Sequence, residues 1–210
     1  MSTKQVLIIL CELGIPYEIK PVRFDEVKKE PFVSLNPNGR MPAIEDPNTD
    51  IVLWESGAII EYLVETYDTD HKLSYVDSPE KWQQGSWKHF QMSGQGPYFG
   101  QLTWFGKFHQ EKLPSAISRY ENEMDRITSV IELQLTRTGK SYLVGDKCTF
   151  ADLMFVPWYR AFPGPAEEFL VKTWPEKYLL SYAWNQELNA REGVKQAQKV
   201  GDDFLASNSH

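Results

Sequence analysis

The first third of the chain contains two segments in which apolar residues recur at helical spacing. In residues 4–13 the pattern is that of an amphipathic helix, and Gly14 after it is a natural helix stop. Residues 56–67 show the same pattern, with glutamates on the polar face. Residues 17–22 instead alternate between polar and apolar positions, which predicts a short strand.

A hairpin is predicted directly before the second helix. The segment 46–50 (DPNTD) is rich in turn-forming residues and separates two short strand-like runs at 43–45 and 51–53. We expect these runs to pair as antiparallel strands. A helix, a strand, a hairpin and a second helix together make a small α/β unit.

Helical periodicity dominates the remainder of the chain, after a polar linker at residues 71–81. Helices are expected at residues 78–108, 114–138, 149–161, 175–190 and 192–205. The predicted fold class is therefore α/β followed by all-α. The predicted domains are an α/β unit at residues 1–70 and an all-helical unit at residues 78–210.

Composition and charge exclude several classes of protein. With 22 Lys and Arg against 29 Asp and Glu, the formal net charge of −7 disfavours nucleic-acid binding. No apolar run approaches the roughly 18–20 residues that cross a bilayer. Two distant cysteines, Cys11 and Cys148, suit neither a disulfide scaffold nor, with four scattered histidines, a zinc site. We expect a cytoplasmic protein that holds no metal and binds neither nucleic acid nor membrane. We expect Cys11 to be a buried apolar residue and Cys148 to be structural.

The first candidate binding element is the loop at residues 36–43 (NPNGRMPA). Two prolines and a glycine fix its backbone path immediately before a predicted strand. A cis peptide between Met41 and Pro42 would expose the N–H and C=O of Met41 to the backbone of an extended ligand. A rigid loop that binds nothing is an equally good interpretation of this segment alone.

The second candidate element is Glu55–Ser56, where the predicted hairpin meets the predicted helix. The Ser56 hydroxyl could cap the helix, or it could join the free N–H groups of the first turn in binding a carboxylate. Glu55 beside it could bind an ammonium group. The two residues together would suit an α-amino carboxylate, although a helix cap beside a solvated glutamate is the simpler interpretation.

These motifs resemble those of the cytosolic glutathione transferases, most closely of their fungal nitrogen-regulator-like group. The segment 36–67 resembles the family's cis-proline and glutathione-carboxylate segments. Residues 90–105 (FQMSGQGPYFGQLTWF) resemble that group's first helix of the second domain, and 145–158 (GDKCTFADLMFVPW) resemble the superfamily's buried capping box. The resemblance implies a thioredoxin-like N-terminal domain followed by an all-helical glutathione-transferase domain.

The resemblance also implies roles for individual residues. Met41, beside Pro42, would pair its backbone with the cysteinyl part of glutathione. Glu55 and Ser56 would hold the γ-glutamyl end, and Arg40 would lie near the tripeptide. In the capping box, Thr149 and Asp152 would serve folding rather than chemistry.

The beginning of the chain departs from the family pattern. The family has a strand before its first helix and a thiol-activating residue in the loop between them. Here the predicted helix begins almost at Met1, so the activating position falls at or beside Ser2, and an interior strand of roughly eight to ten residues is missing. Three explanations stay open: the sheet is rearranged, another segment fills the gap, or the recorded sequence lacks its natural start. Ser2 would be either a donor to the thiolate or a terminal residue without a role.

The resemblance places a hydrophobic substrate pocket between the two domains. Its candidate residues are aromatic, namely Tyr98, Phe99, Trp104, Phe105, Phe108 and Trp158. An aromatic stripe at helical spacing belongs to a core more often than to a pocket, so we expect about half of them to touch a ligand. Glycines within residues 94–100 would bend the helix and open room beside glutathione.

The resemblance implies a glutathione-dependent enzyme that adds the thiolate to a bulky apolar electrophile, in fungal detoxification or small-molecule biosynthesis. Retention of glutathione would give conjugation, and its loss after a bond rotation would give cis–trans isomerisation. The alternative is a glutathione-binding or regulatory protein without turnover. The resemblance also implies a homodimer, in which the helix at 56–67 of one subunit packs on the helix at 78–108 of the other.

Overall fold

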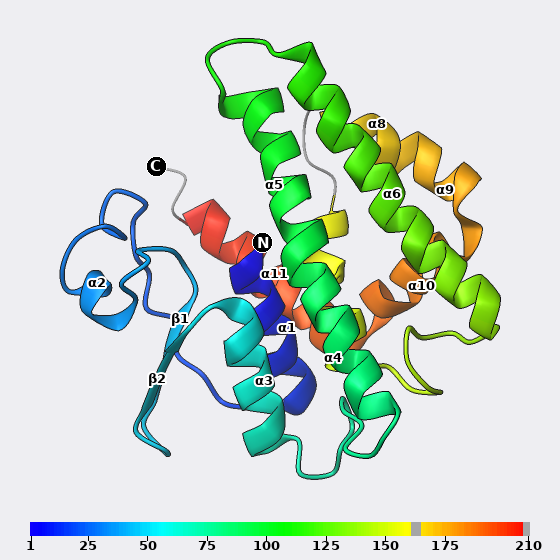
Figure 1. Cartoon of the computed structure of the whole chain (residues 1–210). Helices are drawn as coiled ribbons and strands as arrows, with labels where there is room; N and C mark the ends of the chain where they lie inside the picture. Colours follow the sequence, from blue (N-terminus) through cyan, green and yellow to red (C-terminus); the bar gives the residue numbers. More distant parts are fainter. Residues whose placement is uncertain (161–164, 208–210) are drawn as a thin grey trace. The chain divides into compact units, whose positions relative to one another are not determined.

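The computed structural model describes residues 1–160 and 165–207, which form two compact units. The N-terminal unit consists of Met1–Asp70 together with the segment that begins at Arg191. The helical unit spans His71–Ala190. Figure 1 shows the course of the chain through the elements of both units.

The N-terminal unit contains the two helices that the sequence predicts. Helix α1 (Ser2–Leu13) ends at Gly14, whose φ of 66° is the left-handed conformation that favours glycine at a helix end. Helix α3 (Ser56–Tyr67) packs against α1. The core between them is aliphatic and consists of Val6, Leu7, Ile8, Ile9, Ile59, Ile60, Leu63 and Val64. A single helical turn, α2 (Phe32–Leu35), precedes the candidate loop.

The predicted hairpin is confirmed. Strands β1 (Ala43–Asp46) and β2 (Ile51–Trp54) are antiparallel, with Ala43 opposite Trp54 and Asp46 opposite Ile51. Asp46 also anchors the hairpin to α3, because one of its carboxylate oxygens accepts hydrogen bonds from the hydroxyls of Tyr62 and Tyr67. The hairpin and the start of α3 are therefore held in one fixed arrangement.

The strand predicted at residues 17–22 is absent. In the described part of the chain the sheet has two strands, β1 and β2, and residues 17–22 have no regular structure. Most of these residues are exposed, and Lys20 forms a surface ion pair with Glu45 of β1 at 3.1 Å. A strand is stable only when its backbone groups are paired with a neighbour. No described segment supplies that neighbour, so the alternating pattern does not produce a strand.

The last helix, α11 (Glu192–Ser207), packs against α1 in the N-terminal unit (Figure 1). The contact is close at Gly193, where an added Cβ would lie 2.8 Å from the Glu12 backbone nitrogen. Arg191 forms a two-pronged ion pair with Glu12, with N–O distances of 3.0 and 2.6 Å. Polar and close-packed contacts thus join the first and last helices.

The helical unit begins with a nearly continuous helical segment, where the sequence predicts one helix over 78–108. It consists of α4 (Glu80–Phe90) and α5 (Gly96–Thr103), with π-helical turns at η1 (Gln91–Gln95) and η2 (Trp104–Phe108). Helix α6 (Pro114–Thr138) packs along α5 and has the predicted bounds.

The remaining helices are shorter than predicted. The helix expected at 149–161 is a short α7 (Phe150–Leu153) followed by the 3₁₀ turn η3 (Val156–Tyr159), and part of that range lies outside the described residues. Helix α8 (Pro165–Glu168) and the π-helical turn η4 (Phe169–Thr173) come next. The helix expected at 175–190 is divided into α9 (Trp174–Lys177) and α10 (Leu179–Ala190).

The predicted capping box is confirmed at the start of α7. Asp152 is fully buried, and its two oxygens accept hydrogen bonds of 2.8–3.0 Å. The donors are the backbone N–H and hydroxyl of Thr149, the backbone N–H of Leu143 and the indole N–H of Trp184. Burial raises the pKa of Asp152, although these hydrogen bonds act in the opposite direction.

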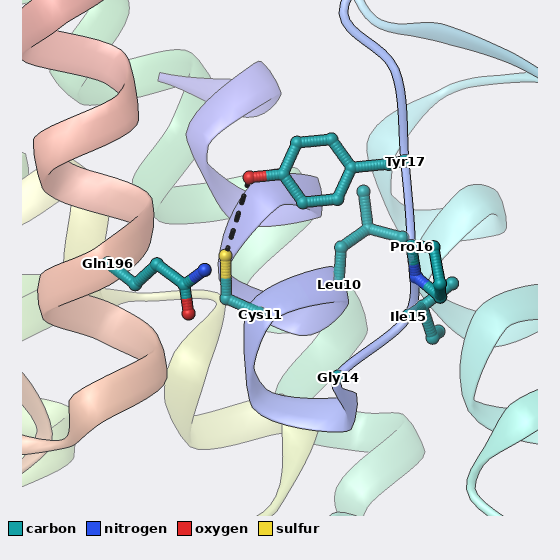
Figure 2. Close-up of a pocket in the computed structure, with 7 residues that line it drawn as sticks. All are labelled: Leu10, Cys11, Gly14, Ile15, Pro16, Tyr17 and Gln196. Carbon is teal, nitrogen blue, oxygen red and sulfur yellow. Dashed lines mark hydrogen bonds between the residues drawn. The ribbon is translucent and has the colours of Figure 1, made fainter.

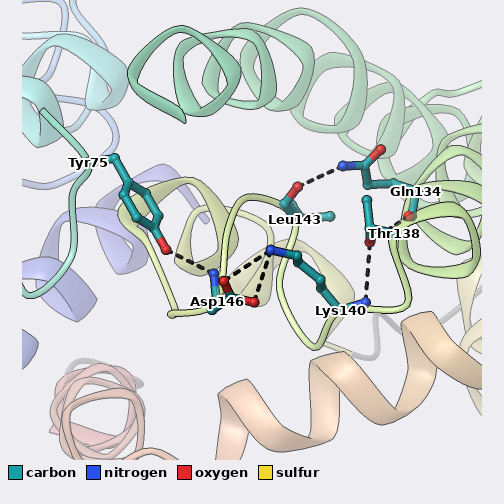
Figure 3. Close-up of polar contacts among 6 residues, drawn as sticks. All are labelled: Tyr75, Gln134, Thr138, Lys140, Leu143 and Asp146. Atoms are coloured by element: carbon teal, nitrogen blue, oxygen red, sulfur yellow. Dashed lines mark hydrogen bonds and ion pairs between the residues drawn. The ribbon is translucent and has the colours of Figure 1, made fainter. Parts of the chain in front are cut away.

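The loop that leads from α6 to the capping box is fixed by polar contacts (Figure 3). Gln134 donates to the carbonyl of Leu143 at 2.8 Å, and Lys140 pairs with Asp146 at 3.0 Å. The hydroxyl of Tyr75 accepts from the backbone N–H of Asp146 at 2.9 Å. These contacts bring the Leu143 N–H to the position where it meets Asp152.

Candidate functional site

The loop at residues 36–43 is organised by Asn36, which is 2% exposed. Its amide nitrogen donates to the carbonyl of Arg40, and its amide oxygen accepts from the backbone N–H of Asn38 at 2.9 Å. The Met41–Pro42 peptide is cis, as the motif predicts. The sequence reasoning missed the role of Asn36, although asparagine before a proline-rich turn is a known signal for such side-chain-to-backbone contacts.

Gly39 allows this loop to pack closely on the preceding segment. Its φ is 59°, and an added Cβ would lie 2.6 Å from the carbonyl oxygen of Val27. Lys28 donates to the carbonyl of Asn38 at 2.7 Å, so its ammonium group contacts the loop backbone. Only glycine fits at this position without moving the loop.

Met41 presents unpaired backbone groups. No described residue forms a hydrogen bond with the N–H or C=O of Met41, and the side chain is half-buried. Arg40 beside it is exposed and forms no ion pair with any residue in the described ranges. The loop thus offers one free backbone donor, one free backbone acceptor and one free cation.

Glu55 joins β2 to α3 in an unusual conformation. Its φ of 69° and ψ of 116° lie in a region that residues other than glycine rarely adopt. Strain of this kind persists where the surroundings fix it, and it is common at functional sites. The Asn38 side-chain amide lies 3.4 Å from the exposed Glu55 carboxylate, so the loop and the start of α3 lie side by side.

Ser56 is the first residue of α3, and its side chain is 3% exposed. The interpretation of Ser56 as a helix cap is wrong, because the N-cap is Glu55 and no side chain caps the helix. The Ser56 hydroxyl donates instead to the side-chain oxygen of Gln5 at 3.1 Å. Gln5 is buried on α1, and no motif in the sequence pointed to it.

Ser2 is part of α1 rather than of a loop before it. It is the first helical residue, it is half-buried, and its hydroxyl has no partner among the described residues. Its role therefore stays a prediction.

The aromatic candidates of the helical unit fall into different environments. Phe99 is 1% exposed and packs edge-on against Tyr159 in the core. Phe105 stacks on Tyr120 at a centroid distance of 5.7 Å, and Tyr98 lies 6.2 Å from the same ring. Two more aromatic rings, 6.1 Å apart, are largely exposed, namely those of Trp104 and Phe108. The Trp158 ring is half-buried beside Gly96.

A cavity of about 310 Å³ in the N-terminal unit involves none of the predicted site residues (Figure 2). It is lined by Leu10, Cys11, Gly14, Ile15, Pro16, Tyr17 and Gln196. Cys11 was expected to be a buried apolar residue, but its half-buried thiol lies in this cavity, 3.7 Å from the Tyr17 hydroxyl. Burial raises the pKa of Cys11, and it raises that of Tyr17 to about 12, so both groups are protonated at neutral pH.

The described residues contain no group of three or more His, Cys, Asp or Glu side chains placed to hold a metal ion. None of the described helices is long and apolar enough to cross a membrane.

Both parts of the chain match known family models. Residues 3–66 match the glutathione S-transferase N-terminal domain, and residues 97–192 match the glutathione S-transferase C-terminal domain. The glutathione S-transferase-like protein tpcF of Aspergillus fumigatus is 46% identical over 201 residues, covering 91% of this chain and 88% of that protein. The transcriptional regulator URE2 of Saccharomyces cerevisiae is 36% identical over 190 residues, covering 73% of this chain and 54% of that protein.

The fold is similar to that of a solved fungal structure. The glutathione transferase URE2P8 of Phanerochaete chrysosporium, crystallised with oxidised glutathione, has a TM-score of 0.88 and 36% identity. The match covers 98% of this chain and 93% of that one. With its thioredoxin-like N-terminal domain and helical C-terminal domain, the chain belongs to the glutathione S-transferase family.

Proposed function

We propose that the protein binds glutathione along the loop 36–43 and the start of α3, and transfers it to an electrophile. The observation that carries the proposal is the unpaired backbone of Met41, held beside Glu55 by the Asn36 and Asn38 contacts. Glutathione is an extended peptide, and its cysteinyl residue would pair with the N–H and C=O of Met41. URE2P8, which is similar over nearly the whole chain, was crystallised with oxidised glutathione.

The charged groups suit the two ends of glutathione. The carboxylate of Glu55 would bind the γ-glutamyl ammonium group. The neighbouring γ-glutamyl carboxylate would accept from the N–H groups of the first turn of α3 and from Ser56, whose hydroxyl would turn away from Gln5. The exposed guanidinium of Arg40 would pair with the carboxylate at the other end.

Chemistry would occur at the sulfur. A free thiol has a pKa of about 8.5, so a donor that stabilises the thiolate increases the reactive fraction at neutral pH. Ser2 is the proposed donor. The thiolate forms a carbon–sulfur bond to one carbon of a double bond in the electrophile. The π electrons move to the other carbon, which then takes up a proton. If the carbanion instead rotates about the former double bond before it is protonated, its electron pair re-forms the double bond, the carbon–sulfur bond breaks, and the thiolate leaves the cis–trans isomer.

A bulky apolar electrophile would suit the aromatic side chains of the helical unit, of which Trp104 and Phe108 are the most exposed. We extend the proposal to a role in small-molecule metabolism or detoxification; the similarity to proteins named glutathione S-transferase-like supports the transferase part of it. We place the protein in the cytoplasm on its two free cysteines.

The second candidate function is glutathione binding without turnover. The Ser2 hydroxyl favours it, because no described residue orients this donor, and a donor without fixed geometry is a poor activator. The similarity to the transcriptional regulator URE2 favours it too.

Calorimetric titration with glutathione tests the binding site. We expect Ser56→Ala and Arg40→Ala each to weaken glutathione binding about tenfold, since each removes one polar contact to a charged group. Ser86→Ala and Arg119→Ala, on exposed faces of α4 and α6, are matched controls that should bind normally. Absence of glutathione binding by the unsubstituted protein would overturn the proposal.

Turnover is tested separately with chlorodinitrobenzene and with a cis-enone whose isomerisation is followed by NMR. Conjugation or isomerisation that falls in Ser2→Ala supports the enzyme. Glutathione binding without either reaction would favour the second candidate.

A further inference from the structure

Helix α1 carries one polar side chain among the residues that it buries. Gln5 is 1% exposed, and the other buried residues of α1 are all aliphatic, namely Val6, Leu7, Ile8 and Ile9. A buried amide is destabilising unless it is hydrogen-bonded, and an aliphatic side chain would suit this face of the helix better. The presence of Gln5 therefore needs an explanation beyond packing.

Gln5 contacts a residue of the proposed glutathione site. The Ser56 hydroxyl donates to the Gln5 side-chain oxygen at 3.1 Å. Ser56 is 3% exposed and is the first residue of α3, which packs on α1. The two residues are 51 positions apart in the sequence, and both lie in the N-terminal unit. Gln5 therefore fixes the direction in which the Ser56 hydroxyl points.

This hydrogen bond would have to change when Ser56 binds a carboxylate. A hydroxyl group has one hydrogen, so Ser56 cannot donate to Gln5 and to the γ-glutamyl carboxylate at once. Its oxygen can still accept, and a primary amide carries donors as well as an acceptor. If the Gln5 amide turns about its last carbon–carbon bond, its N–H replaces its oxygen beside Ser56. The pair would then be hydrogen-bonded both before and after the carboxylate binds.

We propose that Gln5 is a positioning residue of the glutathione site, which acts through Ser56 rather than on the ligand itself. With glutathione bound, the Gln5 N–H donates to the Ser56 oxygen, and the Ser56 hydroxyl donates to the γ-glutamyl carboxylate. Each hydrogen bond in such a chain polarises and strengthens the next, and the last one ends on a charged group. This inference rests on the proposed binding of glutathione at Ser56.

Calorimetric titration of Gln5→Met with glutathione tests the proposal. Methionine keeps the length of the side chain and removes both its donor and its acceptor. We expect glutathione to bind about fivefold more weakly, because the Ser56 hydroxyl is then a weaker donor to the carboxylate. If Gln5 only competed with the ligand for that hydroxyl, the same substitution would strengthen binding, and this result would overturn the proposal.

Two further comparisons separate positioning from a structural role. The first uses γ-aminobutyryl-cysteinylglycine, which is glutathione without its γ-glutamyl carboxylate, and Gln5→Met should leave the affinity for this analogue unchanged. The second combines Gln5→Met with Ser56→Ala, where it should cause no further loss of glutathione affinity. An equal loss for both ligands, or a loss that persists without the Ser56 hydroxyl, would show that Gln5 serves only the packing of α1 and would overturn the proposal.

Two other variants control for damage to the fold. Gln84→Leu removes another buried glutamine, whose amide pairs with the backbone of Tyr75 in the helical unit, and it should leave glutathione affinity unchanged. If Gln5→Met does not fold, Gln5→Asn decides, because its amide is one methylene shorter and is withdrawn from Ser56. It should weaken the binding of glutathione and not that of the analogue.

Failure of the proposed function gives a different result from failure of this inference. If the unsubstituted protein binds no glutathione, the site itself is refuted, and the role of Gln5 with it. If glutathione binds, and Ser56→Ala weakens its binding but Gln5→Met does not, only the role of Gln5 is overturned. All of these measurements are made without turnover, so they apply equally to a protein that binds glutathione and does not transfer it.

Discussion

At the scale of single residues, Asp152 shows how one carboxylate supports an entire loop. It connects the start of α7 with Leu143 in the preceding loop and with Trp184 on α10. Both oxygens face donors only. An isosteric amide would therefore turn an N–H group toward another N–H group, which cannot form a hydrogen bond.

We expect Asp152→Asn to lower the free energy of unfolding by about 2–4 kcal/mol, because it leaves buried donors unpaired. Urea denaturation followed by circular dichroism measures this loss. Asp146→Asn is the control, since it removes an exposed ion pair with Lys140 in the same loop and should cost less than about 1 kcal/mol. Equal losses in the two variants would show that the buried carboxylate has no special role.

At the scale of elements, the packing of α11 on α1 depends on the absence of a side chain at Gly193. Helices approach closely where a glycine faces the partner backbone, and here the partner is Glu12. Gly85 on α4 offers the opposite case, because a Cβ there would meet no atom within 4 Å.

The same substitution at these two glycines should have opposite effects. Gly193→Ala should destabilise the protein by about 1–3 kcal/mol through the clash with α1. Gly85→Ala should stabilise it by about 0.5–1 kcal/mol, since alanine is the better helix former and nothing opposes it. Midpoints of thermal unfolding that move in the same direction would contradict this account of the α1–α11 contact.

The stability of the contact between the hairpin and α3 should decrease at both acidic and alkaline pH. Hydrogen bonds from Tyr62, the larger contributor, and from Tyr67 lower the pKa of Asp46 below its ordinary 3.8. The stability that these bonds contribute is therefore present above pH 3.8, and it is lost as the pH falls through the lowered pKa. The bond to Asp46 raises the pKa of Tyr67 above 10, so its contribution declines as the pH rises beyond 10.

Replacing Tyr62 and Tyr67 together with phenylalanine should therefore shift acid unfolding to higher pH. A titration followed by far-ultraviolet circular dichroism measures the midpoint. Tyr142→Phe, which removes a tyrosine–glutamate contact in the helical unit, is the comparison. An acid midpoint that the double substitution does not move would exclude Asp46 as a contributor.

At the scale of the whole molecule, the sequence predicts elements whose contacts are local and misses those that depend on distant partners. The bounds of α6 and the existence of the hairpin follow from periodicity and from turn residues near in sequence. Residues 17–22 have the strand pattern but lack a strand to pair with, which no local pattern can reveal. The contacts of Gln5 with Ser56, and of α11 with α1, join residues far apart in the chain.

In the candidate site too, the sequence predicts what local motifs specify and misses what depends on distant partners. Motifs with fixed spacing were enough to indicate Met41, Glu55 and Ser56 as candidates. Asn36 was missed, because its importance lies in the partners that it finds in the folded chain. Buried amides carry no sequence signature that separates a satisfied side chain from an unsatisfied one.

The chain is predicted to assemble as a homodimer. Trp82 on α4 is 69% exposed. The family resemblance places α4 in a subunit interface, and a dimer would bury this large apolar side chain. We expect sedimentation at micromolar concentration to give twice the chain mass of 24.3 kDa. Trp82→Glu should shift the mass toward the monomer, because a charge buried at an interface without a partner is costly. Phe24→Glu, at an aromatic residue 86% exposed outside the two helices of the predicted interface, should leave the mass unchanged. A monomeric mass for the unsubstituted protein would refute the dimer, and dissociation by both substitutions would refute the choice of interface.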